Sequence, residues 1–591
     1  MHSEELLRLI KSSSVQDKWK GLVMASSALR NWTEEEILAV LESVGTSFLV
    51  SLLESNERQL RDMGAVESEK MDLLASSLSV LASSCTSRKV CLASFWSQLV
   101  PHLANIVLRE TKQVRQGYIS ENVINCWIIV CSVCSVQEEL LNWFLEKSPL
   151  VQCMIQLCEN GTRVETTTLR SQEELWRQLV KAMSCMALAV AKKKLEKDTK
   201  TRKLLFHILS MVIICFDRWK EEPSHSLDMI HQLYLLSPYF QSVFAKLPKK
   251  DKVWKIDEHL RNALVYCLSN RLNDDLLQQL FSIVVDELRL WKQYDFDIDE
   301  SATWISSVWK YMRFILLMCS VELGVHLRQV LRAPITSTEK ENNREIHLGN
   351  IFQLIELSVE LFQRRMVETD ECSTTRNSGS LGSEEKEEVK ALEALVECIQ
   401  VVVDFLEAEP LKCSNKKEED SQPIRLVKYF TTSLRLLCCF CSLQLPVLEE
   451  RIATVLVHSW EAILSRLEIL FACIDENTFH DLISWTSFAI VHLVAYSETA
   501  VSILEKEVFA GVWIRLVQLF SEQNSSISAN NRSPSISQCV LDIIDLLVCL
   551  SEFPCNRNCI KNHQETLKNI PRSWPMVQES LDNFLESIVG E

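Results

Sequence analysis

The chain has 591 residues, 47% of which are hydrophobic, and it carries a formal net charge of −17. A single hydrophobic core rarely grows beyond about 300 residues, so a chain of this length must form several domains or a one-dimensional stack of repeats. Its 11 glycines and 13 prolines are too few for the tight turns of a large β protein, and its acidic balance argues against nucleic acid as the main ligand.

Helix signals begin at the N-terminus. Ser3 caps a short first helix, and Asp17 opens a second one. Thr33 and Glu36 form a capping box, in which each side chain accepts a hydrogen bond from the other residue's backbone amide, so a third helix is expected to start there. Gly45 is expected to end that helix.

Units of two or three helices then recur at a spacing of roughly 40 residues, which is typical of HEAT and armadillo repeats. One amphipathic pair cannot bury its apolar face alone, so neighbouring pairs must stack on one another. The sequence therefore predicts an all-α fold, an armadillo/HEAT-like α-solenoid in which helical pairs and triplets form a right-handed superhelix. Clear examples of the expected helices are 71–83, 92–108, 121–136 and 137–145.

Three polar stretches, 368–388, 411–423 and 521–535, interrupt the helical pattern. They contain few large apolar side chains, so burial cannot offset the entropy of ordering them, and mobile loops are expected. The expected organisation is an N-terminal solenoid half at 1–368, a mobile acidic and serine-rich loop at 369–388, a helix with a second mobile loop at 389–423, and a C-terminal solenoid half at 424–591.

The helix between the first two polar stretches, 389–406, is expected to stay docked on the solenoid. Its apolar side chains recur at the spacing of one helix face, which predicts a buried stripe. The residues of that stripe are Val389, Leu392, Val396, Ile399 and Val403.

The 22 cysteines lie mostly within apolar helical runs, where a thiol behaves as a small buried hydrophobe. This usage is typical of a reducing compartment, and the start Met1-His2-Ser3 lacks the basic and apolar regions of a secretory signal. A cytoplasmic protein is expected, with the nucleus as the alternative. The thiols expected to be buried include Cys131, Cys134, Cys438, Cys439 and Cys441.

The longest uninterrupted apolar stretches, 123–136 and 204–216, are too short for a membrane span and contain Asn125 and His207. No transmembrane segment is therefore expected. Peripheral association with a membrane remains compatible with the sequence.

No glycine-rich phosphate loop, dinucleotide fingerprint, nucleophile elbow or metalloprotease helix motif occurs in the chain. Together with the helical composition, this makes an enzyme improbable, and no catalytic residue or cofactor is expected. An enzyme would need polar groups with perturbed pKa values converging in one pocket.

One cysteine and histidine pattern has the spacing of metal ligands. Cys555, Cys559 and His563 follow one another at intervals of four in a polar stretch. A closed zinc site needs four ligands and no second pair follows, so a turn with free thiols between two helices is the favoured interpretation and no metal is assigned.

Trp291, Trp304 and Trp309 lie around an acidic turn at 295–300. An exposed tryptophan beside acidic groups could anchor a basic peptide from a partner protein. The favoured alternative is that these rings fill the wide gap between helix layers.

Two basic clusters could attract an acidic ligand, although lysine-rich connections between helices are more often only solvated. The first consists of Lys192, Lys193, Lys194, Lys197, Lys200, Arg202 and Lys203. The second consists of Lys246, Lys249, Lys250, Lys252 and Lys255.

Several segments, in order along the chain, resemble the neurochondrin family of armadillo-like cytosolic proteins. The segment 6–11, the helix 18–29 and the turn 44–49 resemble that family's start, and 304–331 resembles a middle helix. The segments 432–437 and 483–497 resemble two helices near its end. This resemblance implies a helical scaffold with a role in neurite outgrowth and neuronal signalling.

The chain departs from the family pattern in two places. Cys438-Cys439-Phe440-Cys441 replaces the family's tryptophan and leucine after the arginine helix, and the stretch 368–388 has no counterpart.

A non-catalytic adaptor that binds protein partners through a superhelical groove is the favoured function, since solenoids offer long surfaces for extended peptides and helices. The alternative is a nuclear helical-repeat scaffold in genome maintenance or ribosome assembly. That alternative requires a basic groove built from the two lysine clusters, and the net acidity of the chain counts against it.

Overall fold

The computed structural model describes most of the chain, and helices are the only regular elements in that part. The described residues are 3–12, 14–28, 32–54, 67–111, 119–161, 172–194, 199–244, 250–270, 273–293, 302–332, 338–372, 383–408, 422–464, 476–506, 509–525, 534–568 and 575–590. Helix packing divides the chain into two compact units, Met1–Tyr294 and Asp295–Glu591, and each is described by itself.

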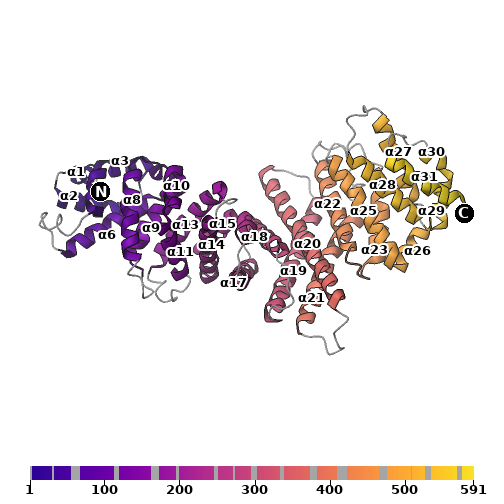
Figure 1. Cartoon of the computed structure of the whole chain (residues 1–591), viewed down its shortest axis with the longest axis horizontal. Coiled ribbons are helices and arrows are strands. Elements are labelled where there is room, and N and C mark those ends of the chain that lie inside the picture. The colour runs from indigo at the N-terminus through magenta and orange to yellow at the C-terminus, as the bar shows by residue number, and fades with distance from the viewer. Residues whose placement is uncertain are drawn as a thin grey trace. The chain divides into compact units, whose positions relative to one another are not determined.

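The first unit contains the helices α1 to α18, most of which are labelled in Figure 1. They are α1 (Ser3–Ile10), α2 (Val15–Ala28), α3 (Glu34–Val44), α4 (Thr46–Glu54), α6 (Glu67–Ser84), α7 (Arg88–Cys91), α8 (Trp96–Thr111), α9 (Glu121–Val136), α10 (Glu138–Glu146), α11 (Ser148–Gly161), α13 (Glu173–Lys194), α14 (Thr199–Trp219), α15 (Pro223–Leu236), the short 3₁₀ helix η2 (Ser237–Tyr239), α16 (Phe240–Phe244), α17 (Lys250–Ser269) and α18 (Asp274–Gln293).

These helices form two rows. In one row α2, α6, α9, α13, α15 and α18 each pack against the next, and in the other α4, α8, α11, α14 and α17 do the same. The rows meet where α8 packs on α9 and α14 packs on both α13 and α15. A stack in which each helical pair contacts mainly its neighbours is the defining feature of a solenoid.

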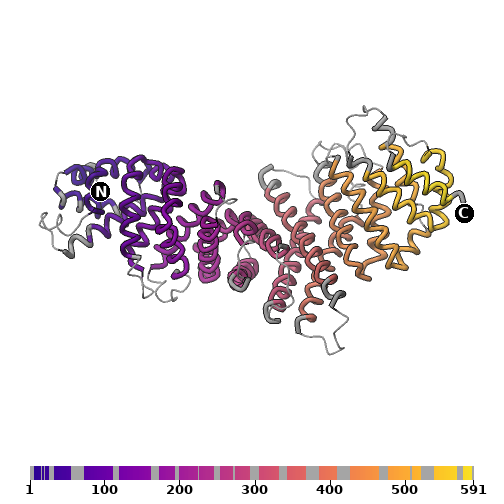
Figure 2. The backbone as a smooth tube through the Cα atoms, viewed as in Figure 1, coloured from indigo at the N-terminus to yellow at the C-terminus, as the bar shows by residue number. Residues whose placement is uncertain are grey.

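The second unit contains α19 (Ala302–Arg332), α20 (Thr338–Cys372), α21 (Ser383–Glu407), α22 (Gln422–Cys441), α23 (Glu449–Leu464), α25 (Glu476–Tyr496), α26 (Glu498–Lys506), α27 (Ala510–Ser525), α28 (Pro534–Leu550), α29 (Pro554–Asn562), α30 (Gln564–Lys568) and α31 (Pro575–Gly590). One row runs through α20, α22, α25, α28 and α31, and the other through α19, α21, α23, α26 and α29. Figure 2 shows the backbone of this unit running back and forth between successive helices. The predicted all-α solenoid is therefore confirmed.

The repeat is longer than the roughly 40 residues expected from the sequence. Successive helices of one row begin at Glu121, Glu173, Pro223 and Asp274, which gives a repeat of about 50 residues.

The predicted capping box at the start of α3 is confirmed. The backbone amide of Thr33 donates to Glu36, and the amide of Glu36 donates to the Thr33 hydroxyl. Gly45 ends the helix with a φ of 85°, in the region that favours glycine, and its amide donates to the Leu41 carbonyl. These local signals need no tertiary contact, which is why they were visible in the sequence.

The helix predicted at 389–406 is present as α21, and it packs against α19 along its length. The predicted stripe is confirmed at Ile399 and Val403, which are buried, whereas Leu392 and Val396 are partly buried and Val389 is 49% exposed. The buried face is wider than predicted and includes Ala391, Leu395, Cys398 and Val402, because α21 also contacts α20 and α22.

The division between the two units also differs from the expected organisation. It falls at 294–295, because α20 and α21 both pack on α22 and α19 packs on both of them, so all four helices belong to the second unit. Of the predicted mobile segments, 373–382, 411–421 and 526–533 lie outside the described residues. The loop prediction was wrong at their edges, where 368–372, 383–388, 422–423, 521–525 and 534–535 belong to helices.

One described helix is long and apolar enough to cross a bilayer when judged by length and composition alone. It is Ile305–Leu331 within α19, and 28% of its most apolar window is buried in the protein. Two bent pairs, Glu34–Val44 with Thr46–Glu54 and Asn477–Tyr496 with Glu498–Glu505, also qualify if each pair counts as one span. The sequence-based expectation rested on uninterrupted apolar stretches, of which 123–136 lies in a helix too short to span a bilayer. It did not consider α19, whose apolar run contains isolated polar residues but keeps a mean hydropathy of 1.5.

The cysteine prediction is confirmed for most of the named thiols. Cys131, Cys134, Cys438 and Cys441 are buried, whereas Cys439 is half-buried. All five are free cysteines.

Candidate functional site

A carboxylate and two imidazoles meet between the first two helices of the second unit. Glu322 and His326 lie one helical turn apart on α19, so they share a face of that helix. His347 lies on α20, which packs against α19. Among the described residues, this is the one group of metal-ligating side chains close enough together to hold an ion.

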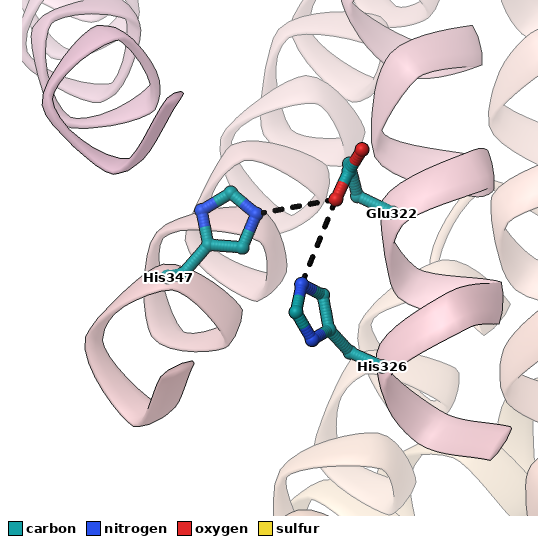
Figure 3. A group of neighbouring side chains, drawn as sticks. All are labelled: Glu322, His326 and His347. Carbon is teal, nitrogen blue, oxygen red and sulfur yellow. Dashed lines mark ion pairs between the residues drawn. The ribbon is translucent and has the colours of Figure 1, made fainter. Parts of the chain in front are cut away.

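The three side chains converge on one oxygen, as Figure 3 shows. Oε2 of Glu322 lies 3.6 Å from Nε2 of His326 and 3.6 Å from Nε2 of His347. The two imidazole rings meet edge to face with their centroids 5.1 Å apart. His347 is buried, while Glu322 and His326 are partly exposed.

The imidazoles of His326 and His347 hold the pKa of Glu322 at about 2, because both favour the carboxylate over the neutral acid, and this outweighs the opposite effect of burial. The cluster therefore presents one anionic oxygen and two imidazole nitrogens at neutral pH. That donor set is found in zinc and other first-row transition-metal sites.

The zinc candidates from the sequence lie elsewhere in the second unit. Cys559 and His563 approach each other, with Sγ 3.9 Å from Nδ1. The thiol of Cys555 instead donates to the backbone carbonyls of Leu504 and Glu505, at 3.5 and 3.0 Å. The structure thus brings two of the three residues together and directs the third toward the preceding repeat.

Two of the three candidate tryptophans are core residues. Trp291 is fully buried, and its Nε1 donates to Oδ1 of Asp257 at 2.9 Å. Trp309 is also buried and stacks on Phe362 with ring centroids 4.9 Å apart. The side chain of Trp304 and the acidic turn at 295–300 lie outside what the structure describes.

The first basic cluster is partly paired with acidic groups and neighbouring helices. Nζ of Lys193 lies 2.6 Å from Oε2 of Glu138, and Nζ of Lys200 donates to the Ser148 hydroxyl. Most of the second cluster lies in residues whose side chains are not described.

A second candidate site is an exposed aromatic surface on α22 and α25, which the sequence analysis did not identify. The Arg435 guanidinium of α22 lies over the ring of Trp485 on α25, 4.4 Å from its centroid. The same guanidinium forms a bidentate ion pair with Glu356 of α20. Nε lies 2.7 Å from Oε1, and Nη2 donates to Oε2 at 3.0 Å. Arg435 is therefore held in place between three helices of one row.

The apolar part of this surface follows Trp485 along α25. Phe488 is 52% exposed, and its ring lies 4.1 Å from that of His492. Val491 is also exposed. We call Arg435, Trp485, Phe488 and Val491 the α22–α25 surface.

Both sites depend on information that a linear pattern does not contain. Glu322 and His326 are visible as a carboxylate and an imidazole four residues apart on a helix, but the contribution of His347 follows only from the packing of α20 on α19. Phe488 looks like a core residue in the sequence, and only the packed row shows that its side of α25 faces outward.

No protein family model and no curated protein matches the chain. Among solved structures, it is similar to a circular tandem repeat protein with novel repeat topology and enhanced subunit contact surfaces, at 12% identity and a TM-score of 0.21, covering 100% of this chain and 98% of that one. It is also similar to the karyopherin Kap121p bound to the SUMO protease Ulp1p (9% identity, TM-score 0.23, 99% and 70% covered) and to Kap121p bound to Nup53p (10% identity, TM-score 0.21, 99% and 78% covered).

TM-scores this low carry no argument about function. The class of the protein follows from its own helix packing: each unit is an α-solenoid of stacked helical pairs.

Proposed function

We propose that this chain is a non-catalytic scaffold that binds a protein partner through the α22–α25 surface. The observation that carries the proposal is the exposure of Phe488 and Val491 beside an arginine that is fixed on a tryptophan. Tryptophan, tyrosine and arginine are enriched among the residues that contribute most of the binding energy at protein interfaces. A partner segment with an aliphatic or aromatic anchor side chain fits this chemistry.

The fixed geometry of the surface supports binding as well. The ion pair of Arg435 with Glu356 and its stacking on Trp485 restrict the guanidinium before any partner arrives. A group that is already ordered loses less conformational entropy on binding. One helical turn before Phe488 on α25, Ser484 donates a hydrogen bond to Asp542 of α28, which joins α25 to the next helix in the row.

In its finer form, the proposal is a neurochondrin-like adaptor in the cytoplasm, with a role in neurite outgrowth and neuronal signalling. The support for this is the ordered series of segments that resemble that family, from 6–11 to 483–497. The nuclear scaffold of the alternative hypothesis would use nucleic acid or ribonucleoprotein partners, whose binding weakens strongly with salt.

The test is affinity capture of the tagged full-length chain from neural-type cell extract at low and high salt, followed by mass spectrometry. The variant Phe488→Asp is compared with Leu92→Asp, which changes an equally exposed leucine (53%) in the first unit. We expect the amount of the main protein partners captured by Phe488→Asp to be at least tenfold lower than with the wild type. Leu92→Asp should capture them in unchanged amounts.

Equal capture by both variants would contradict binding through the α22–α25 surface. The identity of the captured proteins tests the finer proposal separately. Cytoplasmic signalling proteins are expected, whereas chromatin or preribosome components lost at high salt would overturn it.

A further inference from the structure

We propose that Glu322, His326 and His347 form a binding site for one divalent transition-metal ion, for which Zn²⁺ is the best fit. The ligand atoms are Oε2 of Glu322 and the Nε2 atoms of the two histidines. The proposal is independent of protein binding, because it assigns a separate role to the helix pair α19 and α20.

The distances fit a shared ion better than direct hydrogen bonds. The two oxygen-to-nitrogen distances of 3.6 Å exceed the usual hydrogen-bond range, which ends at about 3.2 Å. Two atoms separated in this way can each lie about 2.1 Å from one zinc ion, with an angle of about 118° at the metal. All three ligand atoms lie within 4.8 Å of one another, so modest side-chain rotations complete the arrangement.

The packing of the two helices positions the ligands. Leu323 and Leu327 on α19 and Leu348 on α20 are buried, and each is adjacent in sequence to a ligand. The backbone of the ligands is therefore fixed by the core of the second unit. Ligands held on rigid helices pay little ordering entropy when an ion binds.

The donor set selects the class of ion. Two imidazole nitrogens favour zinc and other first-row transition metals, whereas Mg²⁺ and Ca²⁺ prefer sites made only of oxygen atoms. Zinc has no geometric preference from its d electrons, so it tolerates a set in which two ligands come from one helical turn. Three protein ligands leave a fourth position, and the partly exposed Glu322 (22%) and His326 (14%) give water access to it.

A bound ion would join α19 to α20 and stabilise the first helical pair of the second unit. An ion that binds only the folded state raises stability with its concentration relative to its dissociation constant. Zinc should therefore raise the thermal unfolding midpoint of the wild-type protein.

The test is isothermal titration of the metal-free full-length protein with Zn²⁺. A Cys555→Ser, Cys559→Ser background removes the other zinc candidate suggested by the sequence. We expect one ion per chain and at least tenfold weaker binding in Glu322→Gln and in His326→Gln. His458→Gln is the matched control, because His458 lies 3.7 Å from the single carboxylate of Glu461, on one helix and without a second imidazole in the group.

Replacing Zn²⁺ by Co²⁺ provides a second readout, because the absorption spectrum of bound Co²⁺ depends on its ligands. We expect visible d–d bands and no thiolate-to-cobalt charge-transfer band in the near ultraviolet. Circular dichroism of the metal-free variants checks folding, and the partly exposed positions of Glu322 and His326 make these two variants safer than a change at the buried His347.

Three results would overturn the proposal. One is absence of Zn²⁺ binding to the folded Cys555→Ser, Cys559→Ser protein. Another is a Zn²⁺ affinity that stays unchanged when Glu322→Gln or His326→Gln is added to that protein and it remains folded. The third is a charge-transfer band, which would place the metal on cysteines instead.

Discussion

Nε1 of Trp291 donates a hydrogen bond to Oδ1 of Asp257, which joins α18 to α17 inside the first unit. Nε of Arg261 donates to the other carboxylate oxygen, also at 2.9 Å. Burial raises the pKa of Asp257 despite these partners, because the charged carboxylate is removed from water. The indole of Trp291, for which the sequence favoured a place between helix layers over a role as a partner anchor, therefore stabilises a buried carboxylate.

Trp291→Phe should lower the free energy of unfolding by about 1 to 3 kcal/mol, since it removes a hydrogen-bond donor from a buried carboxylate. Urea unfolding followed by circular dichroism measures the change. Trp513→Phe is the control, because Trp513 is equally buried and its Nε1 has no hydrogen-bond partner within the described part of the chain. An equal loss in both variants would show that lost packing volume, and not the hydrogen bond, sets the cost.

Asn556→Ala should loosen the connection between α26 and α27. The buried Asn556 amide accepts a hydrogen bond from the Ala510 backbone amide and donates one to the Leu504 carbonyl, both at 2.8 Å. Loss of both bonds leaves two buried backbone groups with fewer partners, at a cost on the order of 2 kcal/mol. Hydrogen exchange measured by mass spectrometry should show faster exchange at the Ala510 amide. Unchanged exchange there would contradict this role.

The ion pair of Asp217 with His259 should make the stability of the first unit depend on acid pH. Oδ2 of Asp217 lies 2.7 Å from Nδ1 of His259, and Lys220 donates to Oδ1 at 2.8 Å. Burial alone would raise the pKa of Asp217, but the hydrogen bonds from His259 and Lys220 outweigh it and hold the pKa below its ordinary value.

Because the folded pKa of Asp217 is the lower one, its stabilisation is complete above the unfolded pKa of about 3.9 and is lost as pH falls through the folded value. Asp217→Asn should therefore lower the urea midpoint at neutral pH, and its difference from the wild type should narrow below about pH 4. A difference that stays constant across this range would exclude the carboxylate charge as its source.

The thiols of Cys134 and Cys438 should resist alkylation in the folded protein. Burial raises the pKa of each to about 12, and the thiolate is the reactive form. Mass spectrometry after iodoacetamide treatment should find both unmodified in the native state and modified in urea, whereas the half-buried Cys555 should react in both. Native modification of Cys134 would indicate frequent opening of α9.

The features that could be predicted from the sequence are those set by interactions between residues close together in the chain. The capping box of Thr33 and Glu36 and the stop at Gly45 depend only on neighbouring residues, and both were found. The buried face of α21 was misjudged at Val389, because that face is set by three contacting helices and not by periodicity alone.

The candidate sites were missed for a similar reason. His347 lies far from Glu322 in the sequence and reaches it only through the packing of α20 on α19. Arg435 and Trp485 are brought together by the row of helices that the repeats build. Apolar residues such as Phe488 look alike in sequence whether the row covers them or leaves them exposed.

Hydroxyl-radical footprinting of the complex shows whether the α22–α25 surface contacts a protein partner. The oxidation rates of the Trp485 and Phe488 side chains are compared with and without the captured partner, with exposed Leu92 as the internal reference. We predict that the partner slows oxidation of Phe488 and Trp485 several-fold and leaves Leu92 unchanged. Unchanged oxidation rates at both aromatic residues in a saturated complex would show that the partner does not bind the α22–α25 surface.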